Sequence, residues 1–216
     1  AIGGVPGVLK AIKFNSSAGY PLALRPGVTG KKQFAHKEGD EVVVSITFER
    51  EIQKWREYMD TGVNPQQFYY LAYTKDELQK QSKVDEKRTR GIYCGSMVRN
   101  VLARQKVGFL LAAINAMEGE SFISINPLSK DINKVWHYLT EHCRWQLVSF
   151  IAGDYKNFDQ HYIRAFQEAA YRILWRLIEK SGCDWVSKDW WDRFVSLEID
   201  SGVQYGGYRY FFRAAH

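Results

Sequence analysis

A short apolar segment that ends at a glycine and an aspartate constrains this chain more than any other feature. Residues 146–152 read Gln-Leu-Val-Ser-Phe-Ile-Ala, a β-branched and aromatic run that is typical of a buried strand. Gly153 ends the run, Asp154 follows at once, and Asp159 comes five residues later. We therefore expect Asp154 at the carboxyl end of a strand, where one or two aspartates commonly hold hard cations bound to phosphates. Asp159 is expected on the turn that begins the next helix, where capping of free backbone amides is a competing role.

Positive charge is concentrated upstream of this segment. Between Lys75 and Lys106 there are nine lysines and arginines against four acids, a surplus of five in a chain whose formal net charge is +6. Such a concentration is typical of a surface that binds phosphate, although a solvated charged hairpin would carry the same residues. Together with a metal-type aspartate, it favours a protein that holds a triphosphate while a divalent ion stabilises its transfer.

The order of several short motifs resembles the RNA-dependent RNA polymerases of picornaviruses and picorna-like viruses. These motifs are Ser16-Ser17-Ala18-Gly19-Tyr20-Pro21, Gly30-Lys31-Lys32, Lys75-Asp76-Glu77-Leu78, Lys83-Val84, Arg88-Thr89-Arg90 and Asp154-Tyr155 followed by Phe158-Asp159. They occur from about Phe14 to Asp159 in the order of the family. No single motif is specific, but the ordered set is.

The resemblance implies template-directed transfer of nucleotides from nucleoside triphosphates to an RNA 3′ end by a two-metal mechanism. It implies these roles: Asp154 as catalytic metal ligand and the Tyr155 carbonyl as second ligand of Mg²⁺ (or Mn²⁺), Lys75, Lys83 and Arg90 for the nucleoside triphosphate, Asp159 for the ribose hydroxyl, and Lys31 and Lys32 for template RNA. The implied partners are an RNA template and primer, nucleoside triphosphates and other viral replication proteins. The implied location is the host cell cytoplasm, at membrane-associated replication complexes.

The expected fold class is α+β. The resemblance names a fingers subdomain over residues 1–144, the beginning of a right-hand polymerase palm over 145–200, with its first strand, its helices and the first metal aspartate, and strands that return to the fingers over 201–216. The family pattern continues after Asp159 with a Ser-Gly loop and then a Gly-Asp-Asp turn; the sequence contains no Gly-Asp-Asp, and the Ser-Gly loop is expected to begin about where the chain stops, at Arg213-Ala214-Ala215-His216. We therefore expect the chain to be an internal part of a longer polymerase, truncated before the Ser-Gly loop and inactive alone.

Local patterns predict individual elements. Helices are expected over residues 49–59, 100–117 and 131–143, and strands over 68–73 and 89–93 on either side of the basic turn. Residues 1–40, rich in Gly and Pro, are expected to be mostly loop with short extended pieces. Residues 205–212, with Gly206-Gly207 at the turn, predict a hairpin.

The clearest periodicity follows Asp159. Apolar residues at steps of three and four predict one helix face, formed by Phe166, Ala169, Ala170, Ile173, Leu174, Leu177 and Ile178. We expect this helix to pack on the strand that ends at Asp154. A second, aromatic-rich helix is predicted around Trp185, Trp190, Trp191 and Phe194. Its tryptophans favour core or interface packing, with base stacking as the alternative.

Composition excludes several other classes of protein. A chain of 216 residues with 45% hydrophobic content can bury a sizeable core in one large or two small domains. Cys94, Cys143 and Cys183 are isolated and include no C-x-x-C pair, so neither a disulfide framework nor a zinc site is supported. No apolar stretch approaches the length that spans a bilayer.

Two further hypotheses remain open from the sequence. In the first, the chain is a non-catalytic RNA-binding module of a viral replicase, whose basic strands hold phosphate and whose Asp154 is a helix cap. In the second, the tryptophans form a surface that binds host factors or replicase components.

Overall fold

The computed structural model describes residues 2–6, 9–75, 78, 80–86, 91–116, 128–130, 132–141, 153 and 163–211. The chain divides into two compact units, one formed by residues 1–110 with 163–216 and the other by residues 111–162. Four predicted site residues lie outside the described residues, namely Arg90, Asp154, Tyr155 and Asp159. The predicted strand at 146–152 lies outside them too.

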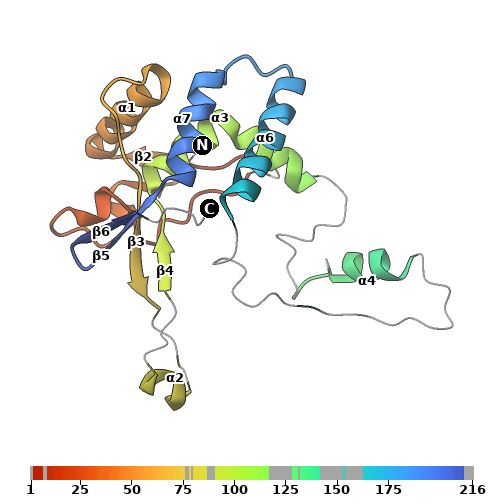
Figure 1. Cartoon of the computed structure of the whole chain (residues 1–216), viewed down its shortest axis with the longest axis horizontal. Helices are drawn as coiled ribbons and strands as arrows, with labels where there is room; N and C mark the ends of the chain where they lie inside the picture. The colour runs from red at the N-terminus through yellow and green to blue at the C-terminus, as the bar shows by residue number, and fades with distance from the viewer. Residues whose placement is uncertain are drawn as a thin grey trace. The chain divides into compact units, whose positions relative to one another are not determined.

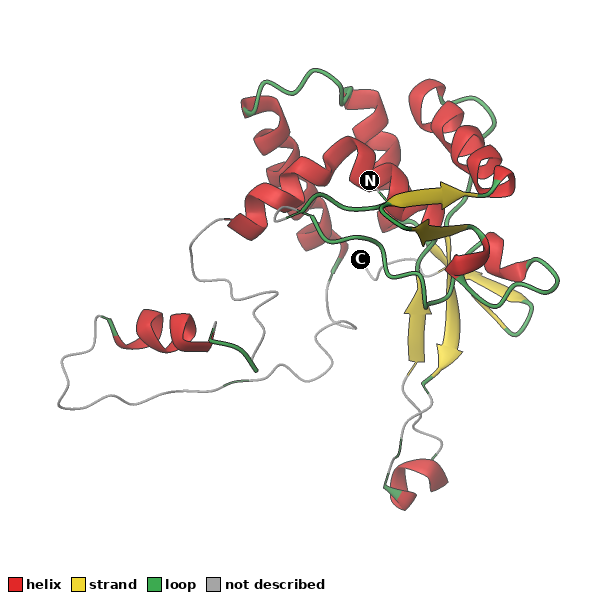
Figure 2. Ribbon diagram, turned by 180° about the vertical axis from the view of Figure 1, so that it is seen from behind, coloured by secondary structure: helices red, strands yellow, loops and turns green. Residues whose placement is uncertain are grey.

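A four-stranded sheet in the larger unit joins strands that are far apart in the sequence (Figures 1 and 2). Its strands are β3 (Tyr69–Thr74), β4 (Gly91–Cys94), β5 (Gly202–Tyr205) and β6 (Tyr208–Phe211), in the order β4-β3-β5-β6. Each hairpin, β3–β4 and β5–β6, is antiparallel, whereas β3 and β5 run parallel. The two predicted hairpins are confirmed, and the parallel junction between them is a finding of the structure.

Within the described residues, the long helices that accompany this sheet are four in number, and local sequence features explain where they begin and end. They are α1 (Ile46–Thr61), α3 (Met97–Ala116), α6 (Arg164–Lys180) and α7 (Lys188–Ile199). The Ser45 hydroxyl accepts a hydrogen bond from the Phe48 amide (3.3 Å) at the start of α1, and Ser187 does the same for Trp190 (3.2 Å) at the start of α7. Gly62, with a φ of 77°, ends α1 in the left-handed conformation.

The helices bury one shared apolar core, to which Phe68 contributes from just before β3. The buried side chains of the three central helices are Phe48, Ile52, Trp55 and Met59 of α1, Met97, Val98, Val101 and Leu102 of α3, and Trp190, Trp191, Phe194 and Leu197 of α7. Trp55 stacks on Phe68, just before β3, with ring centroids 4.0 Å apart. The prediction of core packing is therefore confirmed for Trp190 and Trp191, while Trp185 is half-exposed with its ring against Phe109.

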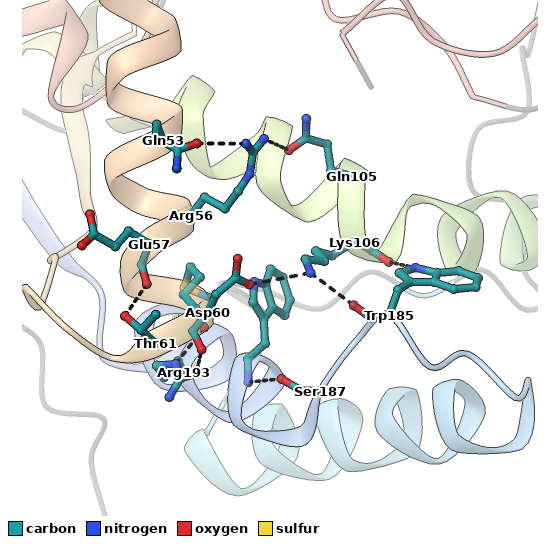
Figure 3. Close-up of polar contacts among 12 residues, drawn as sticks. Gln53, Arg56, Glu57, Asp60, Thr61, Gln105, Lys106, Trp185, Ser187 and Arg193 are labelled. Carbon is teal, nitrogen blue, oxygen red and sulfur yellow. Dashed lines mark hydrogen bonds and ion pairs between the residues drawn. The ribbon is translucent and has the colours of Figure 1, made fainter.

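Polar contacts cross-link the ends of these helices (Figure 3). The Arg193 guanidinium of α7 donates to the Met59 carbonyl (2.8 Å) and the Asp60 carbonyl (2.9 Å) in the last turn of α1. A cation at this position also complements the negative end of the helix dipole. Lys106 and Trp185 exchange two hydrogen bonds, each 3.2 Å long, from side-chain nitrogen to backbone carbonyl. These contacts fix α1, α3 and the start of α7 to one another.

The predicted apolar face of α6 is divided in the structure. Ile178 is buried and Leu174 is half-buried against the core, whereas Phe166, Ile173 and Leu177 are 61%, 63% and 42% exposed. The partner expected for this face, the strand at 146–152, lies outside the described residues. Packing of the exposed residues on the segment 146–152 stays a prediction.

The remaining elements are short. The larger unit also contains the 3-10 turns η1 (Leu22–Leu24) and η2 (Lys31–Gln33), the hairpin of β1 (Ala35–Glu38) and β2 (Glu41–Val44), and α2 (Gln81–Asp85) between β3 and β4. The smaller unit contains α4 (Ile132–Thr140), which confirms the helix predicted at 131–143. Within the described residues no helix is both long and apolar enough to cross a membrane. Cys94 and Cys183 are free thiols, and Cys143 lies outside the described residues.

Candidate nucleic-acid interface

The backbone of the first motif, Ser16–Pro21, contacts the backbone just after β4. Gly19 has a φ of 68°, and a Cβ at this position would lie 2.2 Å from the Gly95 carbonyl oxygen. The Met97 amide donates to the Ala18 carbonyl at 2.9 Å, beside this contact. Only glycine combines the left-handed conformation with so close an approach of two backbones. The loop around Gly19 therefore lies directly against the residues that join β4 to α3.

The Gly30-Lys31-Lys32 turn folds back onto the same loop. The Lys31 backbone amide donates to the Ser16 carbonyl (3.0 Å), and the Lys31 ammonium donates to the Ser16 hydroxyl (2.7 Å). The Gln33 side-chain oxygen accepts from the amides of Thr29 (2.6 Å) and Gly30 (3.3 Å) and so closes the turn. Two motifs separated in the sequence are thereby brought together at one place.

A groove of about 390 Å³ runs between these motifs and one face of the sheet. The motif side contributes Ser17, Ala18, Ala23, Val28, Thr29 and Gly30, and the strands contribute Tyr73, Ile92 and Cys94. Tyr73 lies opposite Ile92 in the β3–β4 ladder, so both point to the same face. Apolar and aromatic walls with a few hydroxyl groups are typical of a pocket for a small organic group, and a nucleobase has this character.

Cations gather beside the groove. The pKa of Lys31 is lowered, chiefly by its partial burial; the nearby Cys94 side chain opposes this shift, and the Arg104 guanidinium adds to it. Arg104 of α3 donates to the Lys10 carbonyl at 2.6 Å, and burial lowers its pKa as well. Two cations that share a partly desolvated site create a positive potential, which an anion such as phosphate relieves.

The structure separates the predicted site residues into three groups. Lys31 and Lys32 lie in η2, Lys31 half-buried beside the groove and Lys32 exposed. Lys75 directly follows β3 and Lys83 lies in α2, so the structure places neither with Lys31 at the groove. Arg90, Asp154, Tyr155 and Asp159 lie outside the described residues. The predicted RNA and nucleotide sites therefore stay predictions.

Two cations of the basic stretch serve the fold. The Arg99 guanidinium pairs with the Glu198 carboxylate, and the Lys106 ammonium lies 3.7 Å from the Asp60 carboxylate. A count of charges within residues 75–106 therefore overestimates the positive charge that is available to phosphate. The acids that pair with Arg99 and Lys106 lie outside that stretch, on α7 and α1. The groove residues Tyr73 and Ile92 and the nearby Arg104 carried no motif signal, and their convergence depends on tertiary contacts.

The part of the chain that the structure describes contains no group of three histidine, cysteine, aspartate or glutamate residues that could hold a metal ion. The predicted ligands Asp154 and Tyr155 are outside that part.

Comparisons with known proteins agree on one family. The family described as viral RNA-dependent RNA polymerase matches residues 5–201. The genome polyproteins of poliovirus type 1, strains Mahoney and Sabin, are each 27% identical over 167 residues, which is 77% of this chain and 7% of the polyprotein. The solved structure of a Sicinivirus 3Dpol RNA dependent RNA polymerase is 20% identical, has a TM-score of 0.70, and is matched over 99% of this chain and 42% of its own.

These matches confirm the mixed α+β fold class and show that this chain spans less than half of that solved polymerase chain.

Proposed function

The chain belongs to the viral RNA-dependent RNA polymerase family, of the picornavirus-like kind, and we propose that it is the portion of such an enzyme that guides template RNA and nucleotide. The observation that carries this proposal is the groove in which Ser17 and Gly30 face Tyr73 and Ile92. Motifs that are separated in the sequence meet there beside two cations.

The groove is proposed as part of the template path. The Lys31 ammonium, held by Ser16, and the Arg104 guanidinium bind phosphate oxygens, since charged groups of this kind supply most of the affinity for nucleic acid. Tyr73 and Ile92 offer an aromatic and an aliphatic surface to a base. Lys32, exposed on the same turn, adds a second phosphate contact.

The nucleoside triphosphate is proposed to bind at the far end of the β3–β4 pair. Thr74 and Gly91 are the last paired residues of the two strands, and Lys75 and Arg90 are their immediate neighbours in the sequence. Arginine binds phosphate oxygens through a planar fork, and lysine binds them as a point charge. Lys83 of α2 adds charge at the same end of the strands, and Asp159 accepts a hydrogen bond from the ribose hydroxyl.

Nucleotidyl transfer in this proposal depends on Mg²⁺ or Mn²⁺ bound by Asp154 and the Tyr155 carbonyl. Asp154 and Tyr155 lie outside the described residues, among which no group of three histidine, cysteine, aspartate or glutamate residues could hold a metal ion. The contribution of the described residues is to bind and orient RNA and nucleotide.

The subdomain assignment belongs to the same proposal, with fingers over residues 1–144, the beginning of the palm over 145–200 and returning strands over 201–216. Pairing of β5 with β3 supports the last of these, because it brings residues 202–204 beside residues 69–71. Other viral replication proteins are proposed as partners, at membrane-associated complexes in the host cytoplasm. The alternative function, an RNA-binding module without chemistry, makes use of the same groove.

Primer extension by the full-length polymerase that contains this chain tests the proposal. We expect extension of a primed RNA template, and we expect Lys31→Gln to weaken template affinity and to reduce its dependence on salt by about one counterion. RNA binding without any extension by the full-length protein would favour the binding module.

A further inference from the structure

The β5–β6 hairpin presents three tyrosines on one exposed face. Tyr205 pairs with Tyr208 and Val203 with Tyr210, and directly paired residues in an antiparallel ladder lie on the same face. The exposed fractions of Tyr205, Tyr208 and Tyr210 are 50%, 70% and 46%. Gly206 and Gly207, with φ values of 54° and 85°, supply the positive φ that a tight two-residue turn requires.

The opposite face of the hairpin is held in place. The Arg209 guanidinium lies over the rings of Tyr69 (5.0 Å) and Tyr20 (5.9 Å), and Phe211 contacts Tyr69 with ring centroids 5.7 Å apart. These contacts fix the hairpin on the rest of the sheet from one side. The tyrosine face is therefore presented by a supported strand pair.

The tyrosine face is turned away from the groove. Tyr73, Ile92 and Cys94 line the groove. Across the sheet, Cys94 of β4 and Gln204 of β5 both pair with Leu71 of β3, one on each side. Gln204 in turn pairs with Arg209 of β6. Arg209 thus shares the face of the groove residues, while its neighbours Tyr208 and Tyr210 point to the other face. A ligand on the tyrosine face is distinct from one in the groove.

The chemistry of the hairpin suits an anionic, aromatic ligand. Residues 202–211 include no aspartate or glutamate, and the chain has a net charge of +6. The hairpin therefore does not repel phosphate. Exposed aromatic rings on strands of a basic protein stack the bases of single-stranded nucleic acid, and each base adds affinity with little sequence preference.

We propose that Tyr205, Tyr208 and Tyr210 form a base-stacking platform for single-stranded RNA on the face of the sheet opposite the groove. The proposal rests on the proposed function in taking RNA as the ligand. It adds a second contact that reads base rings, while the groove cations bind phosphate.

The test compares RNA with and without bases. Affinity of the full-length polymerase for a labelled single-stranded oligonucleotide and for an abasic oligonucleotide of equal length is measured by fluorescence anisotropy. Replacing all three tyrosines by leucine should weaken binding of the base-bearing RNA by at least about tenfold and leave the abasic RNA unchanged. The triple Tyr→Phe variant keeps the rings and should bind both like the parent.

The salt dependence separates this platform from the groove. The Tyr→Leu variant should keep the salt dependence of the parent, since stacking releases no counterions, whereas Lys31→Gln should lower it and weaken both RNAs. If the Tyr→Leu variant binds RNA as tightly as the parent, the platform is overturned. This holds whether or not analytical sedimentation shows that self-association of the protein has changed. Equal losses on both RNAs would overturn it as well. Primer extension by the same parent reports separately on the polymerase proposal.

Discussion

Arg99 and Glu198 form a part-buried ion pair that joins the beginning of α3 to the end of α7. Two guanidinium nitrogens donate to the two carboxylate oxygens, and the side chains are 18% and 5% exposed. The guanidinium also lies over the rings of Tyr70 (5.3 Å) and Phe68 (5.9 Å), so β3 and the residue before it share the contact. One side chain thus links two helices to the strand that leads to Lys75.

Removing one member of this pair should destabilise the protein strongly. Arg99→Leu leaves the Glu198 carboxylate buried without its partner, and changes of this kind cost about 3–5 kcal/mol. The double variant Arg99→Leu with Glu198→Leu should recover much of that loss, because neither charge then remains buried. Urea unfolding of the parent, the single variant and the double variant measures both effects. A double variant less stable than the single one would contradict this account.

Substitution of Gly19 should disrupt the clasp with Gly95. Gly19→Ala combines a left-handed φ of 68° with a Cβ only 2.2 Å from a carbonyl oxygen, so the loop must move. Gly27→Ala is the matched control, because its φ is 74° and nothing lies within 4 Å of the added Cβ. The control should lose only about 1–2 kcal/mol from the backbone conformation. Thermal unfolding should show a clearly larger loss for Gly19→Ala, together with weaker RNA binding. Equal losses in both variants would remove the close contact as the cause.

RNA affinity should depend on pH through Lys31. Burial lowers the pKa of Lys31, so its ammonium loses its proton at a lower pH than an exposed lysine does. As the pH rises through that lowered value, one phosphate contact is lost and binding weakens. Lys31→Arg keeps its charge in this range and should bind with a flatter pH profile. Binding measured from neutral to alkaline pH on both proteins checks this, and parallel profiles would exclude Lys31 as the titrating group.

Asp154→Ala tests the predicted metal ligand. In the full-length enzyme this change should lower primer extension by at least about a hundredfold, the effect of losing one group that stabilises transition-state charge. Template affinity should barely change, because the groove beside Lys31 is intact. Extension close to that of the parent would remove Asp154 from the active site.

Asp159→Ala tests the predicted contact with the ribose hydroxyl. Loss of this acceptor should slow ribonucleotide incorporation and narrow the preference over deoxyribonucleotides, by an energy of about 1–3 kcal/mol. Asp159→Asn should retain part of the preference. Incorporation of matched ribonucleotides and deoxyribonucleotides by both variants gives the ratio. A helix cap at Asp159 would instead lower thermal stability and leave that ratio intact.

Local patterns determined most individual elements of this protein. The aromatic residues of the strand Tyr69–Thr74, the i, i+4, i+7 spacing of Phe48, Ile52 and Trp55, and the Gly206-Gly207 turn are features that span only a few residues. Backbone geometry sets these periods, so they can be read without knowing the partner surface. The ordered motifs determined the polymerase family in the same way, since they are carried by the sequence itself.

Tertiary structure alone decided which distant segments meet. The parallel pairing of Tyr70 with Val203, the clasp of Gly19 on Gly95 and the division of the α6 face have no local signature. The role of individual cations is likewise not visible in the sequence. Arg99 is one of nine positive charges in the basic stretch, and only the folded structure shows that it pairs with Glu198 of α7. Whether a cation binds a ligand or pairs with an acid of the same chain depends on which groups lie close to it in the folded protein. Distances between residues that are far apart along the chain cannot be read from the sequence.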